Sequence, residues 1–281
     1  YMARDCIKHK SEFCKKRKVV TLCIIGFVCF FLDTFGIGNF ATMQAAFRVT
    51  KPTPVKVMPG TLNVGSCLPA TAEFVAVTLA LNATLEIDAL TIICMIVAAI
   101  LGASFGVRVV IRFNINAIRI ALSAALLLSS IFLICKQLGI GAFGIEGSLS
   151  ELRGGALLLA CIGNFIFASL SNVGCGLYAP AMAMLNTLNF NTKLCLPILS
   201  GSTSGCQPSS SFKYVQSGKY DRVAATCLNL AGIPGAIFAT VFIAKIDVYW
   251  LLWIVIGIMY YTIVMYIFAV IKDLREQRTT Q

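Results

Sequence analysis

The sequence predicts an all-α polytopic membrane protein with about ten helical segments, eight to ten of which cross the membrane. Of its 281 residues, 58% are hydrophobic and 12% are charged, whereas soluble domains average roughly 45–50% apolar and about 25% charged residues. The apolar residues form runs of about 15 to 25, which is long enough to cross a hydrocarbon core roughly 30 Å thick. The basic residues lie between these runs, so they indicate membrane topology rather than nucleic-acid binding.

Glycine, proline and charged residues divide the chain into five plus five segments. The first five lie near residues 19–35, 36–48, 57–81, 87–107 and 120–135. The second five lie near residues 154–171, 173–188, 194–212, 223–244 and 249–271. The segments at 36–48 and 173–188 are rich in glycine and shorter than the roughly 17 residues of a straight span. We expect these two to cross or to form broken helices or re-entrant hairpins.

The distribution of basic residues predicts that both termini are cytoplasmic. If all ten segments cross, 19 of the 23 Lys and Arg residues fall on one side, and only Lys136, Arg153, Lys193 and Lys245 fall on the other. Positive charge collects on the cytoplasmic side of membrane proteins. We therefore expect a multi-pass protein of the plasma membrane, with its first span retained rather than cleaved as a signal peptide.

The two halves of the chain resemble each other. At an offset of 138 residues, glycine, alanine and proline recur in order: Gly36, Gly38, Ala41 and Pro59 match Gly174, Gly176, Ala179 and Pro197. One residue later in register, Cys67 and Pro69 match Cys206 and Pro208. At an offset of 133, Asp88, Cys94, Ala98, Gly102, Ala103 and Phe105 match Asp221, Cys227, Ala231, Gly235, Ala236 and Phe238. Since each half has an odd number of crossings, the pattern predicts an inverted repeat.

This repeat defines the predicted organisation of the chain. It comprises a basic cytoplasmic tail (1–18), a first transmembrane repeat (19–137), an extracytoplasmic loop (138–153), a second repeat (154–273) and a cytoplasmic tail (274–281). In inverted-repeat transporters the substrate binds between the repeats, beside discontinuous helices whose N-termini point at anionic groups. The sequence therefore predicts a site where the interrupted elements of the two halves meet.

Neutral hydrogen-bonding residues surround these interrupted elements and suit a small oxyanion. One element runs from Asp33 to Glu73 and the other from Ser171 to Ser211. The candidate binding residues are Gly36, Gly38, Asn39, Thr61, Asn63, Ser66, Cys67, Gly174, Gly176, Ser202, Thr203, Ser204, Cys206 and Gln207. The alternative is that these small residues only allow close helix packing, as is common in membranes.

The layout resembles the TauE/SafE sulfite exporter family, also called the toluene sulfonate uptake permeases. The resemblance extends from about residue 19 to 271 and is carried by two halves, each with a Gly-x-Gly element and a Pro- and Ser/Thr-rich helix. Gly174, Gly176 and Pro180 match the family pattern best, whereas Asn39 and Thr42 depart from it. The resemblance implies transport, most simply export, of sulfite, thiosulfate, sulfoacetate or another organosulfonate. A potential negative inside assists each outgoing charge by about 2.3 kcal/mol per 100 mV.

Asp33 and Glu73 are the only carboxyl groups within apolar segments. An ionisable group in such a place suggests function by default, and we consider proton coupling for both. The alternatives are a helix cap for Asp33, which directly precedes a new segment, and a paired or water-exposed position for Glu73.

The residue types argue against several other chemistries. His9 is the only histidine, so we expect no histidine metal site, and neither Gly-x-Gly pair is followed by the Lys-Ser/Thr of a phosphate loop. We expect no enzyme activity, cofactor or nucleic-acid partner; the expected partners are a small anion, the lipid bilayer and a coupling proton. Three alternatives stay open, namely a carrier of another small anion, a channel, and a thiol redox enzyme using Cys67, Cys206 or Cys175.

Overall fold

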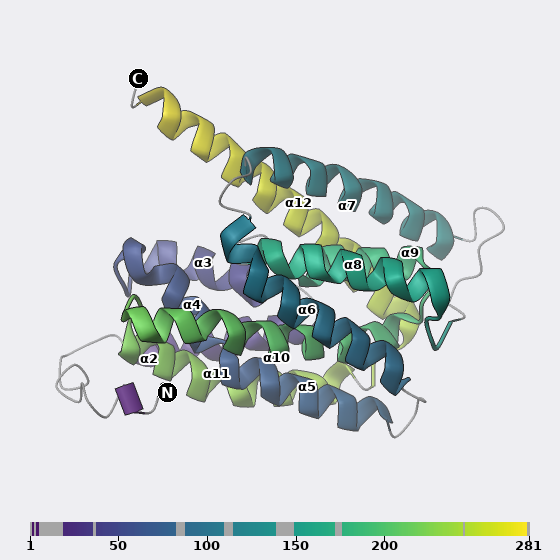
Figure 1. The fold of residues 1–281 in the computed structure, drawn as a ribbon, viewed down its shortest axis with the longest axis horizontal. Coiled ribbons are helices and arrows are strands. Elements are labelled where there is room, and N and C mark those ends of the chain that lie inside the picture. Colours follow the sequence, from purple (N-terminus) through teal and green to yellow (C-terminus); the bar gives the residue numbers. More distant parts are fainter. Residues whose placement is uncertain are drawn as a thin grey trace.

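The computed structural model describes residues 2, 4–5, 19–35, 38–82, 88–109, 115–138, 149–171, 176–243 and 245–279. The first half of the chain contains α2 (Val19–Thr34), α3 (Asn39–Thr50), the short η2 (Val55–Val57), α4 (Met58–Gly65), α5 (Cys67–Asn82), α6 (Ala89–Val109) and α7 (Ile115–Gln137). The second half contains α8 (Gly154–Ser171), α9 (Tyr178–Thr187), α10 (Thr192–Ser217), α11 (Arg222–Ile243) and α12 (Val248–Thr279). Figure 1 shows these helices packed as one elongated bundle.

The all-α membrane architecture predicted from the sequence is confirmed. Each of the ten predicted segments contains a helix, and α8 has the predicted bounds of 154–171. Among the described residues, five helices are long and apolar enough to cross a membrane: Met58–Leu81, Asn116–Cys135, Gly154–Ser171, Arg222–Ile243 and Tyr249–Arg275. Val19–Thr34 and Ala89–Phe105 are shorter apolar helices. The protein is therefore embedded in a membrane by several apolar helices.

The two glycine-rich segments form short helices. α3 has 12 residues and α9 has 10, so at 1.5 Å per residue they are about 18 Å and 15 Å long, too short for a core of roughly 30 Å. Both segments are therefore short helices that do not span such a core by themselves. α4 begins close to Lys219, whose carbonyl would lie 2.2 Å from a Cβ on Gly60. Hence α2 and α3 form a hairpin that returns to the end of the bundle where α11 begins.

The two halves pack against each other with a repeated contact. On α6, a Cβ added to Gly102 would lie 2.2 Å from the carbonyl oxygen of Phe165 on α8. On α11, a Cβ added to Gly235 would lie 2.4 Å from the carbonyl oxygen of Phe27 on α2. The glycines are 133 residues apart and the phenylalanines 138, the same offsets as in the sequence repeat. The pairs α2–α11 and α8–α6 are thus equivalent, and each joins one half to the other.

Cysteines obey the same relation. Cys23 on α2 hydrogen-bonds with Cys227 on α11, and Cys161 on α8 lies near Cys94 on α6. The offsets are again 138 and 133. All four thiols are free, so they are repeat-related packing residues at the interface between the halves.

Helix α10 runs through the centre of the bundle, in contact with helices of both halves. Its glycines admit large apolar side chains: a Cβ on Gly201 would lie 2.7 Å from Ile96, and one on Gly205 would lie 2.7 Å from Ile100. α7 and α12 pack side by side at the edge of the bundle (Figure 1). Close packing therefore explains part of the small-residue pattern in the second half, as the alternative reading of that pattern expected.

Candidate functional site

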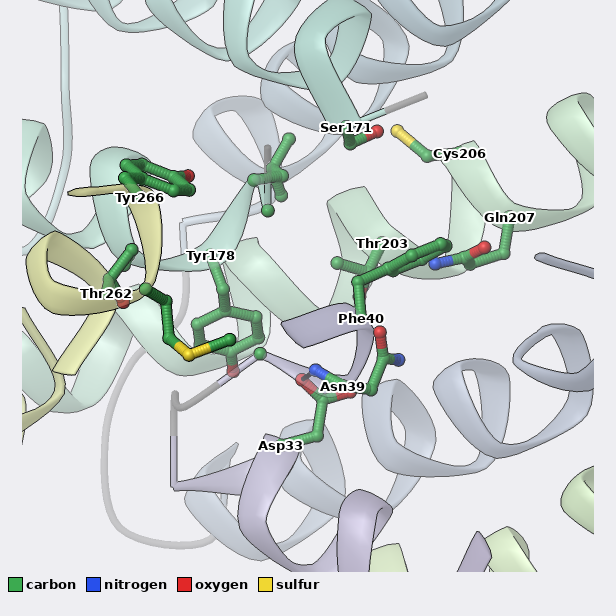
Figure 2. Close-up of a pocket in the computed structure, with 15 residues that line it drawn as sticks. Asp33, Asn39, Phe40, Ser171, Tyr178, Thr203, Cys206, Gln207, Thr262 and Tyr266 are labelled. Carbon is green, nitrogen blue, oxygen red and sulfur yellow. Dashed lines mark hydrogen bonds between the residues drawn. The ribbon is translucent and has the colours of Figure 1, made fainter. Parts of the chain in front are cut away.

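A cavity lies where the α2–α3 and α8–α9 breaks meet. Its lining comprises Asp33, Gly38, Asn39, Phe40, Ser171, Gly176, Leu177, Tyr178, Ala179, Thr203, Cys206, Gln207, Thr262, Met265 and Tyr266. Figure 2 shows Asp33 and Asn39 on one side of this space, with Cys206 and Gln207 of α10 on another and Thr262 and Tyr266 of α12 on a third. The cavity measures about 50 Å³. Since one water needs roughly 10–15 Å³ on this measure, it has room for a few waters or a small ion.

The start of α3 is occupied by a carboxylate of the protein itself. Gly38 precedes α3 with a φ of 82°, a conformation that side-chain-bearing residues rarely adopt. This turn brings the first helical N–H group, that of Asn39, to 2.9 Å from Oδ1 of Asp33, to which it donates. The cap that the sequence offered as an alternative role for Asp33 is therefore present.

The start of α9 is open. Among the residues that the structure describes, no side chain caps this helix. The residue equivalent to Asp33 at an offset of 138 is Ser171, whose hydroxyl donates to the carbonyl of Ala168, 2.8 Å away. The first-turn N–H groups of Tyr178 and Ala179 have no partner within the helix, and both residues line the cavity. Exposed N–H groups at a helix N-terminus favour an anion.

Two residues that line the cavity carry buried polar atoms without a partner. Asn39 is 4% exposed and Gln207 is 6% exposed, and both line the cavity. Nδ2 of Asn39 and Oε1 of Gln207 are buried and have no hydrogen-bond partner among the described residues. Such groups are rare in folded proteins because each costs desolvation energy. Their position at the cavity is consistent with a polar ligand or water.

Asp33 and Glu73 come together beside this cavity. Both are buried, at 2% and 0% exposure, and their carboxyl groups lie close enough to interact with each other. The hydroxyl of Tyr178, from the other half, donates to Oε1 of Glu73 over 3.4 Å. The sequence singled out both acids but did not show that they form one pair.

The structure divides the candidate binding residues into two groups. Gly38, Asn39, Gly176, Thr203, Cys206 and Gln207 line the cavity, together with Asp33. Thr61, Asn63, Ser66, Cys67, Ser202 and Ser204 are absent from its lining. Gly36 and Gly174 lie outside the described residues, as does Cys175.

The polar residues away from the cavity bond to the fold instead. Thr61 accepts from the Asp221 N–H (2.9 Å), and Asn63 and Ser66 donate to carbonyls one turn earlier. Ser202 accepts from Asn164 at 2.9 Å, and Ser204 donates to Thr71 at 3.3 Å. The bonds of Asn63 and Ser66 lie within α4, whereas those of Thr61, Ser202 and Ser204 join separate elements of the fold.

The two repeat-matched cysteines have different surroundings. Cys67 donates to Oγ of Ser211 at 3.1 Å, whereas Cys206 donates to the carbonyl oxygen of Ala99 at 3.3 Å and lines the cavity. Of the two matched thiols, only that of Cys206 lines this cavity.

Three lining residues come from α12, which the sequence assigned to an ordinary last span. Thr262, Met265 and Tyr266 occupy one face of this helix. The one available signal was the i, i+4 spacing of Thr262 and Tyr266 in an apolar run, which puts two polar groups on the same face. Phe40, Leu177 and Tyr178 also line the cavity, and nothing in their sequence pattern distinguished them from packing residues.

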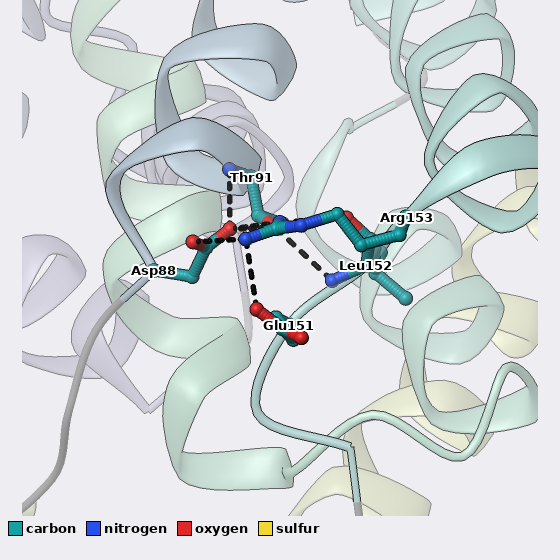
Figure 3. Close-up of polar contacts among 5 residues, drawn as sticks. All are labelled: Asp88, Thr91, Glu151, Leu152 and Arg153. Carbon is teal, nitrogen blue, oxygen red and sulfur yellow. Dashed lines mark hydrogen bonds and ion pairs between the residues drawn. The ribbon is translucent and has the colours of Figure 1, made fainter.

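An ion-pair cluster joins the halves at the end of the bundle where α6 and α8 begin. Arg153 lies 2.7 Å from Oδ2 of Asp88 and 2.8 Å from Oε2 of Glu151. Asp88 also accepts from the backbone N–H and the hydroxyl of Thr91, and its carboxylate thereby caps the start of α6 (Figure 3). Asp221, its repeat equivalent, caps α11 by accepting from the Val223 and Ala224 N–H groups. The matched aspartates are therefore capping residues.

We expect Asp88→Asn to cost less stability than Asp88→Ala. Asn caps a helix as well as Asp does, whereas loss of a cap costs about 0.5–2 kcal/mol. The ion pair itself contributes at most about 1 kcal/mol to the free energy of unfolding, because the Arg153 side chain is 47% exposed and solvent screens the charges. Thermal unfolding of the two variants in detergent measures the difference. Equal losses would show that the cap contributes nothing.

This cluster also makes the stability of the protein depend on pH. The hydrogen-bonded Arg153 guanidinium holds the pKa of Asp88 below its usual range. A depressed folded-state pKa adds stability that is present above about pH 4 and is lost as the pH falls further. The stability gap between wild type and Asp88→Asn should therefore narrow below about pH 4.

Comparison with known proteins leaves the family open. No protein-family model, no curated protein and no solved structure matches this chain. The functional argument therefore depends on the residues and contacts described above.

Proposed function

We propose that this protein is a secondary transporter of a small anion, which binds at the open start of α9. The observation that carries this proposal is the contrast between the two half-helices. Asp33 places a carboxylate at the start of α3, whereas Ser171 leaves the equivalent position of α9 uncapped. The internal carboxylate indicates what kind of group suits such a helix start, since anions are stabilised there by about 0.3–1 kcal/mol or more when partly buried.

The cavity dimensions favour a small oxyanion over a large organic sulfonate. About 50 Å³ accommodates a few water-sized groups. Tyr178 and Ala179 would supply backbone donors, and Nδ2 of Asn39 would supply a third. The resemblance to the TauE/SafE family supports sulfur anions, with sulfite and thiosulfate the best fit by size and sulfoacetate or another organosulfonate the larger members of the class.

Alternating access would proceed by movement of one repeat against the other. The equivalent pairs α2–α11 and α8–α6 cross between the halves, and the cavity lies between residues of both. The end of the bundle with the starts of α7 and α11 would face the cytoplasm of a plasma-membrane protein, because it collects basic residues. These include Lys51, Lys56, Arg119, Lys213, Lys219, Arg222, Lys272 and Arg275. Export from this side would follow the membrane potential.

Thermal unfolding of the purified protein across an anion panel tests the proposed substrate class. The panel contains sulfite, thiosulfate, sulfoacetate, taurine, chloride and phosphate. A ligand present at 100 times its Kd stabilises the native state by about 2.7 kcal/mol. We expect one sulfur anion to raise the melting temperature in a saturable manner while chloride leaves it unchanged. A flat response to every anion at high concentration would contradict the anion site.

A further inference from the structure

The strongest unexplained feature is the buried acid pair beside the cavity. Asp33 ends α2 and Glu73 lies within α5, both in the first half, and Tyr178 begins α9 in the second. Each carboxyl group has one oxygen engaged: Oδ1 of Asp33 accepts from the Asn39 N–H, and Oε1 of Glu73 accepts from the Tyr178 hydroxyl. Oδ2 of Asp33 and Oε2 of Glu73 are buried and have no partner among the described residues.

No basic side chain offsets these two acids in the part of the chain that the structure describes. The ion pairs found there join Arg119 to Asp273, Arg153 to Asp88 and Glu151, and Arg222 to Asp5. The titratable groups facing the pair are neutral ones, namely Tyr178 of α9, Cys29 of α2 and, next to Tyr178, Cys195 of α10.

Two adjacent carboxylates in such a place repel each other and lose their hydration, which is costly without a cation. A single proton relieves the repulsion between the two carboxylates. Held on one carboxyl group, it donates to the other and turns repulsion into a charge-assisted hydrogen bond. It is also the smallest species that satisfies both orphaned oxygens.

We propose that Asp33 and Glu73 share one exchangeable proton, and that this proton is carried with the anion in the transport cycle. The second part of this inference rests on the proposed function. Asp33 lines the cavity, so the proton exchanges with cavity water. Release of the proton leaves two negative charges beside the anion site at the start of α9, which disfavours the anion. By linkage, a bound anion favours the protonated pair to the same extent.

Infrared spectroscopy tests the shared proton without any substrate. The wild-type protein at neutral pH should show the carbonyl stretch of a protonated carboxyl group, shifted in D₂O. Glu73→Gln, which keeps an oxygen for Tyr178, should remove this band. Asp88→Asn, which removes a carboxylate at the end of the bundle, should leave it. Absence of the band in the wild type, or its persistence in Glu73→Gln, overturns the shared proton whether or not any anion binds.

Anion binding and flux then test the coupling. Thiosulfate is the probe because its charge is constant around neutral pH. Above the titration midpoint, the wild-type Kd should weaken by about tenfold per pH unit for one linked proton, whereas the Glu73→Gln Kd should be independent of pH. In proteoliposomes, Glu73→Gln should exchange thiosulfate but not accumulate it under a pH gradient.

Three results would overturn coupling: a wild-type Kd independent of pH, pH-driven accumulation by Glu73→Gln equal to wild type, and wild-type uptake that follows a sodium gradient but ignores a pH gradient. If wild-type protein binds no anion of the panel while the infrared band is present, the proposed substrate class fails and the proton site stands.

Discussion

We expect Ser171→Asp to weaken anion binding by at least about 100-fold. The substitution places a carboxylate in the second repeat at the position that Asp33 holds in the first, 138 residues earlier. There it can accept from the first N–H groups of α9, as Asp33 does from Asn39. The anion then loses its helix-terminal site and also meets a like charge. If each effect costs about 1.4 kcal/mol, each contributes a factor of about ten.

Ser171→Asn is the matched control for this experiment. It has the same size as the Asp variant but no charge, so its anion Kd should stay within a few-fold of wild type. Without anion, Ser171→Asp should melt at the wild-type temperature or above it, because a carboxylate at an uncapped helix start is stabilising. Anion-dependent melting curves and calorimetric titration provide both readouts. If the Asp and Asn variants lose affinity equally, the effect is steric and the helix-terminal site is wrong.

The second large effect is expected at the repeated contact between the halves. Gly102→Ala would place a methyl group 2.2 Å from the Phe165 carbonyl oxygen, and Gly235→Ala would place one 2.4 Å from that of Phe27. Both obstacles are backbone atoms, so a helix must move. Overpacking of this kind costs about 1–3 kcal/mol, more than the gain of up to about 1 kcal/mol in helix propensity from Gly to Ala.

Gly257→Ala on α12 separates the cost of overpacking from the gain in helix propensity. A Cβ there meets nothing within 4 Å, so this variant should be neutral or slightly stabilising through helix propensity alone. Gly102→Ala and Gly235→Ala should lose similar amounts, and their losses should add in the double variant because they share no partner helix. Unfolding in detergent micelles provides the values. A Gly102→Ala protein as stable as Gly257→Ala would show that α6 and α8 are not in close contact.

Much of the fold was predictable because it depends on local features. Segment length and apolar composition decide which stretches form membrane helices. Glycines precede α3 and α9, but proline was a poor guide to breaks, because α10 continues through Pro197 and Pro208 and α11 through Pro234. The offsets of 138 and 133 were also visible in the sequence, and both recur in the contacts of Gly102 with Phe165 and of Gly235 with Phe27. Those offsets needed no tertiary information, since a duplicated chain keeps its residues in order.

The composition of the site was less predictable. Asn39, Thr203 and Gln207 line the cavity as expected, but Thr61 and Ser202 bond to other helices instead. All of these residues are small or polar and lie in glycine-rich elements, so their types are the same. The rotation of each helix about its axis distinguishes them, and helices that are apolar on most faces carry little sequence signal of that rotation.

The sequence by itself determined that this is a membrane-embedded helical protein of two related halves with interrupted helices, because apolar length, helix breakers and repeated order are properties of the chain. Only the tertiary structure decided that Glu73 meets Asp33 and Tyr178, that α12 contributes Thr262 to the cavity, and that one half-helix start is capped while the other is open. Glu73 lies 40 positions from Asp33 and 105 from Tyr178 in the chain, and Thr262 lies 229 positions from Asp33. These features depend on how helices cross and rotate, and that is set by packing between side chains.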